Sequence, residues 1–260
     1  MTAPHRPDHR RATLARSIAL FRAFTVEQTR PDVFYGALAA DSVAQVTAVT
    51  GLSGATVFDV GGGPGWFADA FRAAGATYLA CDPDVGELSA RGEIGAGTVR
   101  ASGEALPVRT GSVDVCFSSN VLEHVRRPWV MGSEMLRITR PGGVVVLSFT
   151  PWWSPWGGHE TAPWHWLGGH RAARRYQRRE GRPPKNRFME TLFPVRVGAA
   201  LRWAATLPGA EVLAAFPRYH PWWAHWVVRV PLLREVVTWN LMLVLRVDSA
   251  RSAAHDPLDA

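Results

Sequence analysis

Cysteine and lysine are almost absent from the sequence. Its two cysteines, Cys81 and Cys116, fall within or beside apolar, strand-like runs, where we expect both thiols to be buried. This pattern supports neither a disulfide scaffold nor a four-ligand zinc site, and it fits the reducing cytoplasm. Lys185 is the only lysine, so the formal net charge of +7 comes from arginine. Arginine suits phosphates, carboxylates and anionic surfaces, although genome composition alone can produce the same bias.

A long uninterrupted apolar run is also missing. Residues 1–17 are basic but lack the apolar centre and the cleavage pattern of a secretory signal. The apolar stretches within residues 222–247 are interrupted by Pro231, by Glu235 and by arginines. The interruptions argue against a transmembrane helix, but not against a segment that lies on a membrane surface. We therefore predict a cytoplasmic protein and leave open an association with the inner face of the membrane.

Strand and helix patterns alternate along the middle of the chain. Short apolar runs predict five strands there, at residues 55–61, 76–82, 97–102, 112–120 and 144–150. Helical patterns lie between them, at residues 66–75, 85–92 and 127–143, the last ending in the turn Pro141-Gly142-Gly143. This alternation is typical of an α/β fold in which helices cover a mostly parallel sheet.

We predict a single domain with a polar tail at each end. Helical patterns at residues 12–27 and 32–49 come before the first strand, and residues 210–216 and 239–247 predict two closing strands. Disordered tails are expected at residues 1–10 and 249–260, and N-terminal helices at residues 11–54. The ligand-binding core covers residues 55–150, and an insertion follows at residues 151–205. The closing strands belong to residues 206–248.

Glycines join the first predicted strand to the next helix, in the stretch VFDVGGGPGWF at residues 57–67. In an open parallel sheet this turn is the favoured ligand site, because glycine lets the backbone approach the ligand. The turn has no lysine followed by Ser or Thr, which excludes a triphosphate-binding P-loop. Trp66 stands where a dinucleotide site has its third glycine, which argues against a dinucleotide. Asp82 ends the second predicted strand, where a carboxylate can accept both hydroxyl groups of a ribose. The turn and this acid together predict a nucleoside site.

Four linked motifs give the chain a family resemblance. They are VFDVGGGPGWF, ACDPD, GEALPVRTGSVDVCFSSNVLEHV and EMLRITRPGGVVVLSF, and they span residues 55–150 in this order. In these motifs the chain resembles the class I S-adenosylmethionine-dependent methyltransferases, particularly the broad group that includes quinone-biosynthesis methyltransferases. The resemblance implies a Rossmann-like three-layer sandwich with a seven-stranded sheet and an antiparallel final strand. It also implies S-adenosylmethionine as the cofactor.

The resemblance further implies which residues hold the cofactor. Asp59 and the glycines of the turn would hold the methionine part, and Asp82 the ribose. The segment from Ser102 to Leu106 would cover the adenine, although many relatives have aspartate where this chain has Ser102. Glu104 either takes over that role or is a solvated surface carboxylate. The implied cofactor-binding set is Asp59, Gly61, Gly63, Gly65, Asp82, Ser102, Glu104, Ala105, Ser118 and Asn120.

A carbon acid or a hydroxyl acceptor needs a base, whereas a neutral amine can attack the methyl group unaided. The candidates for this base are Glu123, His124, His159 and His165. Alternatively, the histidines of the insertion could surround a divalent metal together with Glu160. The spacing of His159, Glu160, His165 and His170 matches no strong ligand motif, so we assign no metal.

Tryptophan and arginine are concentrated after the core. Ten of the twelve tryptophans follow Thr150, and eight basic residues but only one acid lie between Arg171 and Arg187. Such clusters form substrate pockets, sugar-stacking platforms or membrane anchors. We predict a methyltransferase that acts by O- or C-methylation on a lipid-linked sugar, an envelope glycolipid or an isoprenoid quinone, and that associates peripherally with anionic membrane.

Three alternatives to this prediction stay open at this point. They are a methyltransferase of a small soluble metabolite beneath a tryptophan-lined lid, a solvated basic helix without a membrane role, and a non-catalytic cofactor-binding or scaffold protein. We do not favour nucleic acid as a partner, because no recognised nucleic-acid-binding module accompanies the arginine-rich segment. The sequence does not indicate an oligomeric state.

Overall fold

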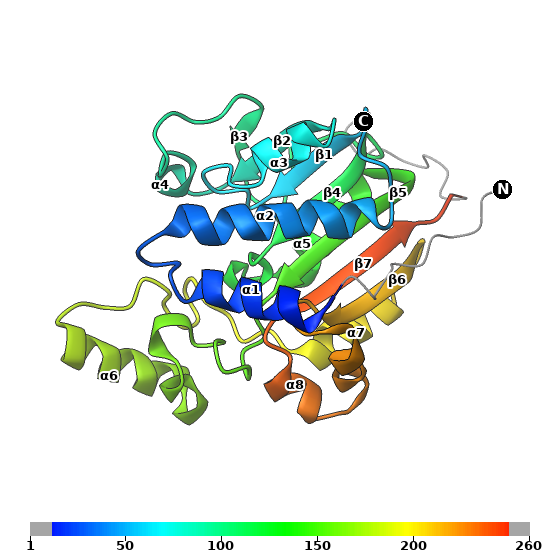
Figure 1. Ribbon diagram of the computed structural model, residues 1–260. Helices are drawn as coiled ribbons and strands as arrows, with labels where there is room; N and C mark the ends of the chain where they lie inside the picture. Colours follow the sequence, from blue (N-terminus) through cyan, green and yellow to red (C-terminus); the bar gives the residue numbers. More distant parts are fainter. Residues whose placement is uncertain (1–11, 250–260) are drawn as a thin grey trace.

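Seven strands form one sheet in the order β3-β2-β1-β4-β5-β7-β6 (Figure 1). The computed structural model describes residues 12–249, so the predicted tails lie outside the described residues except for Ser249. Neighbouring strands from β3 to β5 are parallel, and β7 is antiparallel to both β5 and β6. The predicted α/β fold with an antiparallel final strand is thus confirmed. The strands are β1 (Thr56–Val60), β2 (Thr77–Asp82), β3 (Thr98–Arg100), β4 (Val113–Ser119), β5 (Thr139–Phe149), β6 (Ala210–Pro217) and β7 (Leu241–Val247).

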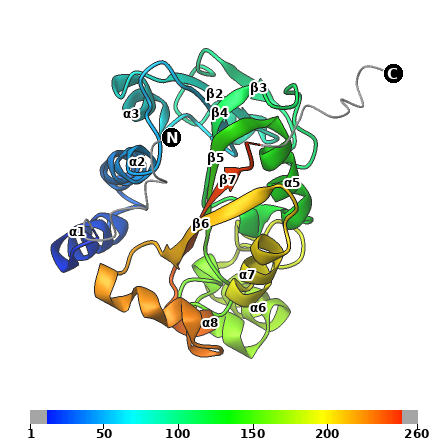
Figure 2. The same ribbon diagram turned by 90° about the vertical axis from the view of Figure 1, so that its right-hand side faces the viewer.

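Helices cover both faces of the sheet (Figure 2). One face carries α1 (Leu14–Phe24), α2 (Pro31–Thr47) and α3 (Ala68–Ala73), and the other carries α5 (Pro128–Ile138) and α7 (Val197–Ala205). The two predicted N-terminal helices are therefore present. Thr13 caps α1 by accepting a hydrogen bond from the Arg16 amide at 3.2 Å. Pro31 is the first residue of α2, a position whose N–H would have no hydrogen-bond partner within the helix.

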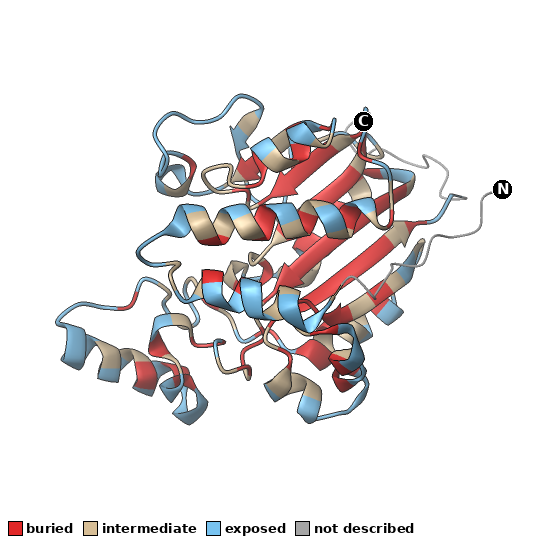
Figure 3. Cartoon of the chain, in the orientation of Figure 1, coloured by how far each residue is buried: buried red, intermediate tan, exposed pale blue. Residues whose placement is uncertain are grey.

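Two apolar layers result, because successive residues of a strand point to opposite faces (Figure 3). On one face, Val57 and Phe117 pack in the same cluster as Phe71 of α3. On the other face, Phe58 packs in the same cluster as Met131 of α5. Cys81 and Cys116 are buried free thiols within this second layer, as expected.

The predicted helix at residues 127–143 ends earlier than expected. Helix α5 stops at Ile138, and β5 begins at Thr139, so the Pro-Gly-Gly sequence lies inside the strand rather than in a closing turn. The pairing of β4 with β5 shifts register in this region, which accommodates a φ of +76° at Gly142. A Cβ on Gly143 would lie 2.8 Å from the carbonyl oxygen of Asp114. The glycine is therefore needed for the close approach of the two strands.

The insertion and the β6–β7 connection consist of short helices at one end of the molecule (Figures 1 and 2). The predicted basic helix is α6, and Gly181 ends it in the left-handed conformation with a φ of +69°. The remaining elements are α4 (Val85–Leu88), η2 (Leu122–His124), η3 (His159–Thr161), η4 (Trp164–Leu167), α6 (Gly169–Glu180), η5 (Trp222–Arg229) and α8 (Leu233–Val237). None of the helices in residues 12–249 has the length and apolar character that crossing a bilayer requires.

Candidate active site

The glycine turn after β1 adopts a conformation that requires its glycines. Gly61, Gly63 and Gly65 have φ values of +77°, +49° and +78°. The amide of Gly61 donates to the carbonyl of Cys81 at 2.8 Å, which ties the turn to β2. A Cβ on Gly61 would lie 2.5 Å from the side chain of Val121, whereas a Cβ on Gly63 would meet nothing within 4 Å. The backbone at Gly63 therefore faces open space, where a ligand can approach it closely.

Asp82 lies beside this open backbone, at the carboxyl end of β2. Its Oδ2 atom accepts a hydrogen bond from the Gly63 amide at 3.2 Å, and its Oδ1 atom accepts one from the Asp84 amide at 2.9 Å. Partial burial raises the pKa of this carboxyl group. Each oxygen keeps a lone pair, so the carboxylate is oriented by the backbone and can still accept from ligand hydroxyl groups.

Asp59 lies beneath the turn and is 1% exposed. The hydroxyl of Tyr78 donates to its Oδ2 atom at 2.6 Å, and a Cβ on Gly62 would lie 3.3 Å from that same oxygen. Burial raises the pKa of Asp59 to about 7, although the hydrogen bond from Tyr78 acts in the opposite direction. Asp59 thus supports the turn from below, and its predicted contact with the methionine part of the cofactor stays a prediction. Tyr78 was not identified from the sequence.

Ser118 and Asn120 occupy the end of β4, beside the turn. The Ser118 hydroxyl donates to the carbonyl of Val60 at 2.8 Å, which joins β4 to β1. Asn120 has a φ of +58°, and its Oδ1 atom accepts a hydrogen bond from the Asn240 amide group at 2.7 Å. Behind them, the fully buried Arg218 donates to the hydroxyl of Ser119 at 2.8 Å. Neither Arg218 nor Asn240 could be found from the sequence, since both follow the insertion and belong to no motif.

The segment expected to cover adenine forms a tight turn. The amide of Glu104 donates to the Ser102 hydroxyl at 3.2 Å, and the amide of Ala105 donates to the Ser102 carbonyl at 3.1 Å. The Glu104 carboxylate accepts from the Arg127 amide at 2.9 Å and from its guanidinium at 2.7 Å. Arg127, which the sequence reasoning missed, thus competes with adenine for this carboxylate. The adenine role of Glu104 stays a prediction.

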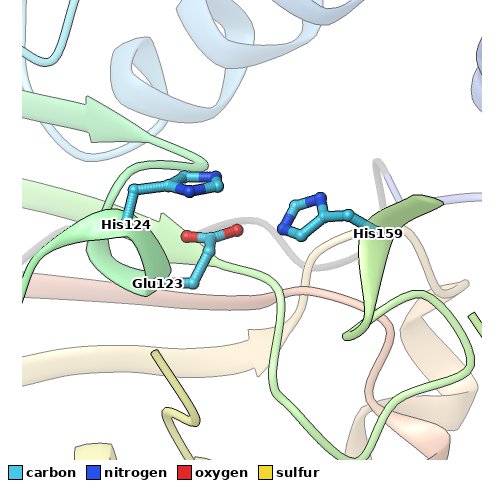
Figure 4. A group of neighbouring side chains, drawn as sticks. All are labelled: Glu123, His124 and His159. Carbon is cyan, nitrogen blue, oxygen red and sulfur yellow. The ribbon is translucent and has the colours of Figure 1, made fainter. Parts of the chain in front are cut away.

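Three of the four candidate bases come together beside the end of β4 (Figure 4). Glu123 and His124 lie in η2, and His159 lies in η3 of the insertion. The rings of His124 and His159 have centroids 5.0 Å apart. The Nδ1 atom of His124 lies 2.7 Å from the Thr191 carbonyl oxygen. That oxygen can only accept, so Nδ1 carries the proton, and Nε2 of a neutral ring keeps its lone pair.

Burial changes the proton affinity of two members of this group. It raises the pKa of Glu123, which is 1% exposed and accepts a hydrogen bond from the Thr150 amide at 2.9 Å. It lowers the pKa of His159 to about 3, so this imidazole is neutral at physiological pH. A neutral imidazole presents a nitrogen lone pair, which can accept a hydrogen bond or bind a metal.

His165 and the other histidines of the insertion do not complete a separate metal site. His165 is buried, its Nε2 atom lies 3.2 Å from the Ser154 carbonyl oxygen, and burial lowers its pKa. Glu160 accepts a hydrogen bond from Asn186 at 3.0 Å, and the ring of His170 packs edge-on against Phe188. Among residues 12–249, His159 instead forms a potential metal-binding group with Glu123 and His124.

Comparison with known proteins gives matches over the core and beyond it. The methyltransferase domain family matches residues 58–147. An uncharacterized methyltransferase of Mycobacterium avium (strain 104) is 56% identical over 247 residues, which cover 91% of this chain and 97% of that relative. An uncharacterized methyltransferase of Mycobacteroides abscessus is 51% identical over 249 residues, with coverage of 91% and 95%. The similarity therefore extends through most of the insertion.

The fold also matches a solved structure. The crystal structure of an S-adenosylmethionine dependent methyltransferase from Mesorhizobium loti superposes with a TM-score of 0.54 at 21% identity. The superposition covers 80% of this chain and 97% of that one. At this identity the likeness concerns the fold alone.

Proposed function

Since this chain belongs to the family of S-adenosylmethionine-dependent methyltransferases, we propose that its acceptor is amphipathic and is methylated at a membrane surface. The acceptor class comprises lipid-linked sugars, envelope glycolipids and isoprenoid quinones, with transfer to oxygen or carbon. The closeness to quinone-biosynthesis enzymes and the inner face of the membrane as the place of action are parts of the same proposal.

S-adenosylmethionine is the cofactor, and it supplies a methyl group on a positively charged sulfur. The turn fits such a ligand, because Gly63 presents backbone to open space beside the oriented Asp82 carboxylate. We assign the ribose to Asp82, the methionine part to the backbone of the glycine turn, and the adenine to the segment from Ser102 to Ala105. Alignment of donor and acceptor is the main requirement, since good positioning supplies roughly 7 to 11 kcal/mol of the barrier.

We assign the removal of the proton from the methyl acceptor to the group formed by Glu123, His124 and His159. Glu123 and His124 follow the end of β4, the strand that also carries Ser118 towards the glycine turn, and the ring of His159 packs beside His124 from the insertion. His124 is oriented by the Thr191 carbonyl and keeps the lone pair on Nε2, which makes it the best-placed proton acceptor of the three. His165 is turned to Ser154 and is the least suitable candidate.

A cluster of exposed tryptophans carries the membrane part of the proposal. Trp222, Trp223 and Trp226 in η5 are 52%, 56% and 53% exposed, and Leu232 just before α8 is 83% exposed. Tryptophan is favoured at the boundary between water and lipid, because its ring is apolar while its N–H is polar. Packing within the protein does not explain these side chains, since more than half of each remains in solvent.

Helix α6 adds positive charge at the same end of the molecule (Figures 1 and 2). Arg171, Arg174 and Arg178 share one face of this helix and line a groove there. None of the salt bridges among residues 12–249 involves these three arginines. Arg175 instead lies 4.0 Å above the ring of Trp164, which fixes α6 against η4. Arginines without an ion-pair partner, at the same end of the molecule as exposed tryptophans, suit an anionic lipid surface.

Sedimentation with lipid vesicles tests the membrane part. The full chain should pellet with vesicles rich in anionic lipid, and the combined variant Trp222→Ala, Trp223→Ala and Trp226→Ala should pellet far less. Ile94→Ala with Val99→Ala is the matched control, because it removes exposed apolar side chains beside α4 and β3. If the wild type stays in the supernatant and labels a water-soluble metabolite, the acceptor is a small soluble molecule. If it binds the cofactor but methylates nothing in cell extracts, a non-catalytic role replaces the proposal.

A further inference from the structure

Glu123, His124 and His159 converge from two separate parts of the chain (Figure 4). One ligand atom of each lies within 4.8 Å of the other two. Within residues 12–249 this is the one group of at least three histidine, cysteine or acidic side chains that meets this criterion. Figure 4 shows the three side chains pointing towards a common space between η2 and η3. The fold thus places two imidazoles and a carboxylate around one point.

The atoms that face this space lack partners within the protein. The Oε2 atom of Glu123 and the Nε2 atom of His159 are both buried without a hydrogen bond, although Oε1 of Glu123 accepts from the Thr150 amide. His124 uses Nδ1 to donate to the Thr191 carbonyl, which leaves Nε2 as the free donor of a lone pair. A histidine fixed through one nitrogen in this way is typical of metal ligands.

Unsatisfied buried atoms of this kind destabilise a protein unless something binds them. A buried acceptor without a partner costs about 1–3 kcal/mol, and more when it is charged. The buried Oε2 atom of Glu123 and the buried Nε2 atom of an unprotonated His159 ring are such acceptors. A single cation would satisfy both of them.

We propose that Glu123, His124 and His159 bind a divalent first-row transition-metal ion. Two imidazoles with one carboxylate favour Zn²⁺ or a neighbouring ion over Mg²⁺ and Ca²⁺, which prefer oxygen ligands throughout. In a tetrahedral zinc site, ligand atoms about 2.1 Å from the metal lie about 3.4 Å from one another. Since the present separations are at most 4.8 Å, each of the three side chains has to move inward by no more than about 1 Å, which is within reach of side-chain rotation.

The ion would have a defined place in methyl transfer, and this part rests on the proposed function. Three protein ligands leave a coordination position open, as in catalytic zinc sites. With the ion bound, the Nε2 lone pair of His124 is used for coordination, so the ion replaces His124 in removing the acceptor proton. An acceptor hydroxyl in the open position would release its proton to bulk water, because the cation stabilises the oxyanion. The oxyanion would then attack the methyl carbon while the bond from that carbon to the donor sulfur breaks, which leaves the demethylated thioether as the product. The site lies next to the end of β4, where the side chain of Val121 packs against Gly61 of the glycine turn.

Metal titration of the intact, tag-free chain tests the proposal. After treatment with a chelator, calorimetry with Zn²⁺ should show one ion per chain with micromolar affinity or better, and Co²⁺ should give a visible absorption band of a protein-bound ion. Glu123→Gln and His159→Gln should each weaken Zn²⁺ binding by at least about 100-fold, because each removes a direct ligand. His170→Gln is the control, since it removes an exposed histidine of the same insertion and should leave the affinity unchanged.

Absence of saturable Zn²⁺ binding by the wild type would overturn the proposal. So would an affinity that His159→Gln leaves unchanged. If circular dichroism shows that Glu123→Gln is unfolded, His159→Gln decides alone, because His159 lies in the short helix η3 of the insertion and not next to a strand of the sheet. The titration needs neither methyl donor nor acceptor, so its failure is separate from a failure of the proposed methyl transfer.

Discussion

The Tyr78 hydroxyl donates a 2.6 Å hydrogen bond to the Asp59 carboxylate, and both side chains are buried beneath the glycine turn. The pair joins the neighbouring parallel strands β1 and β2 below the glycine turn. Because burial raises the pKa of Asp59 to about 7, this carboxyl group titrates near physiological pH. Folding and protonation are therefore linked at the base of the active site.

This linkage predicts a stability that falls as the pH rises. The folded pKa of Asp59 lies above the unfolded value of 3.8, so between these values the folded state holds more protons than the unfolded state. The stabilisation that Asp59 contributes to the folded state is complete below about pH 4 and is lost as the pH rises through 7. The free energy of unfolding should fall by at most about 1.4 kcal/mol per pH unit through this one group. Urea unfolding at pH 5, 6, 7 and 8 measures it.

Asp59→Asn isolates the contribution, because asparagine keeps the shape of the side chain and does not titrate. The difference in unfolding free energy between wild type and variant should change with pH in the predicted direction. Other buried groups such as His159 titrate in both proteins and cancel in this difference. A difference that stays constant from pH 5 to pH 8 would contradict the raised pKa of Asp59.

Gly63→Ala tests the glycine turn as the cofactor site. The added Cβ meets no protein atom but points into the space assigned to the cofactor, and it sits on a backbone with a φ of +49°. Gly54→Ala is the matched control, since Gly54 also has a positive φ, +74°, and open space around it. Both variants should lose about 1–2 kcal/mol of stability. Only Gly63→Ala should weaken S-adenosylmethionine binding, by at least about tenfold in calorimetry; equal affinities would place the cofactor elsewhere.

Gly61→Ala should destabilise the fold itself. Its Cβ would lie 2.5 Å from both methyl groups of Val121 on a backbone with a φ of +77°. Overpacking and the left-handed backbone together predict a loss of about 3 kcal/mol. In a Val121→Ala background the clash is relieved, so Gly61→Ala should then cost about 1–2 kcal/mol. Denaturant unfolding of the double-mutant cycle measures this coupling, and strict additivity of the two changes would exclude the contact.

The arginines of α6 should make membrane binding dependent on salt. Arg171→Gln, Arg174→Gln and Arg178→Gln together should weaken binding to anionic vesicles by about 10- to 100-fold at low salt, since each charge contributes up to about 1 kcal/mol. High salt should remove most of the difference, because it screens the charges. The control variant loses the same charge elsewhere on the surface, through Arg72→Gln, Arg100→Gln and Arg109→Gln. Equal losses in both variants would indicate general charge attraction and no oriented surface.

Much of the fold followed from local pattern. Short apolar runs such as residues 112–120 can only be buried strands when helices alternate with them, and the sheet formed accordingly. The Pro-Gly-Gly sequence was misjudged because it resembles a helix-ending turn, whereas the close approach of β5 to β4 requires glycine there. That requirement arises from tertiary contact and is invisible in the local sequence.

The candidate site was predictable where backbone conformation dictates residue type. Positive φ angles select Gly61, Gly63 and Gly65, so the turn stands out in the sequence. The meeting of His159 with Glu123 could not be predicted in the same way, because it depends on the path of an irregular insertion. Arg218 and Tyr78 escaped notice for a similar reason, since their roles come from partners that are distant in the chain.

Transfer of labelled methyl groups to a cell-envelope extract tests whether the acceptor is amphipathic and whether the glycine turn holds the methyl donor. The full chain is incubated with the extract and isotopically labelled S-adenosylmethionine, and the products are separated by solvent partition and identified by mass spectrometry. We predict that label enters a lipid-soluble product with the wild type, that this labelling is strongly reduced with Gly63→Ala, and that Gly54→Ala behaves as the wild type. Label confined to water-soluble products, or equal labelling by the wild type and Gly63→Ala, would contradict it.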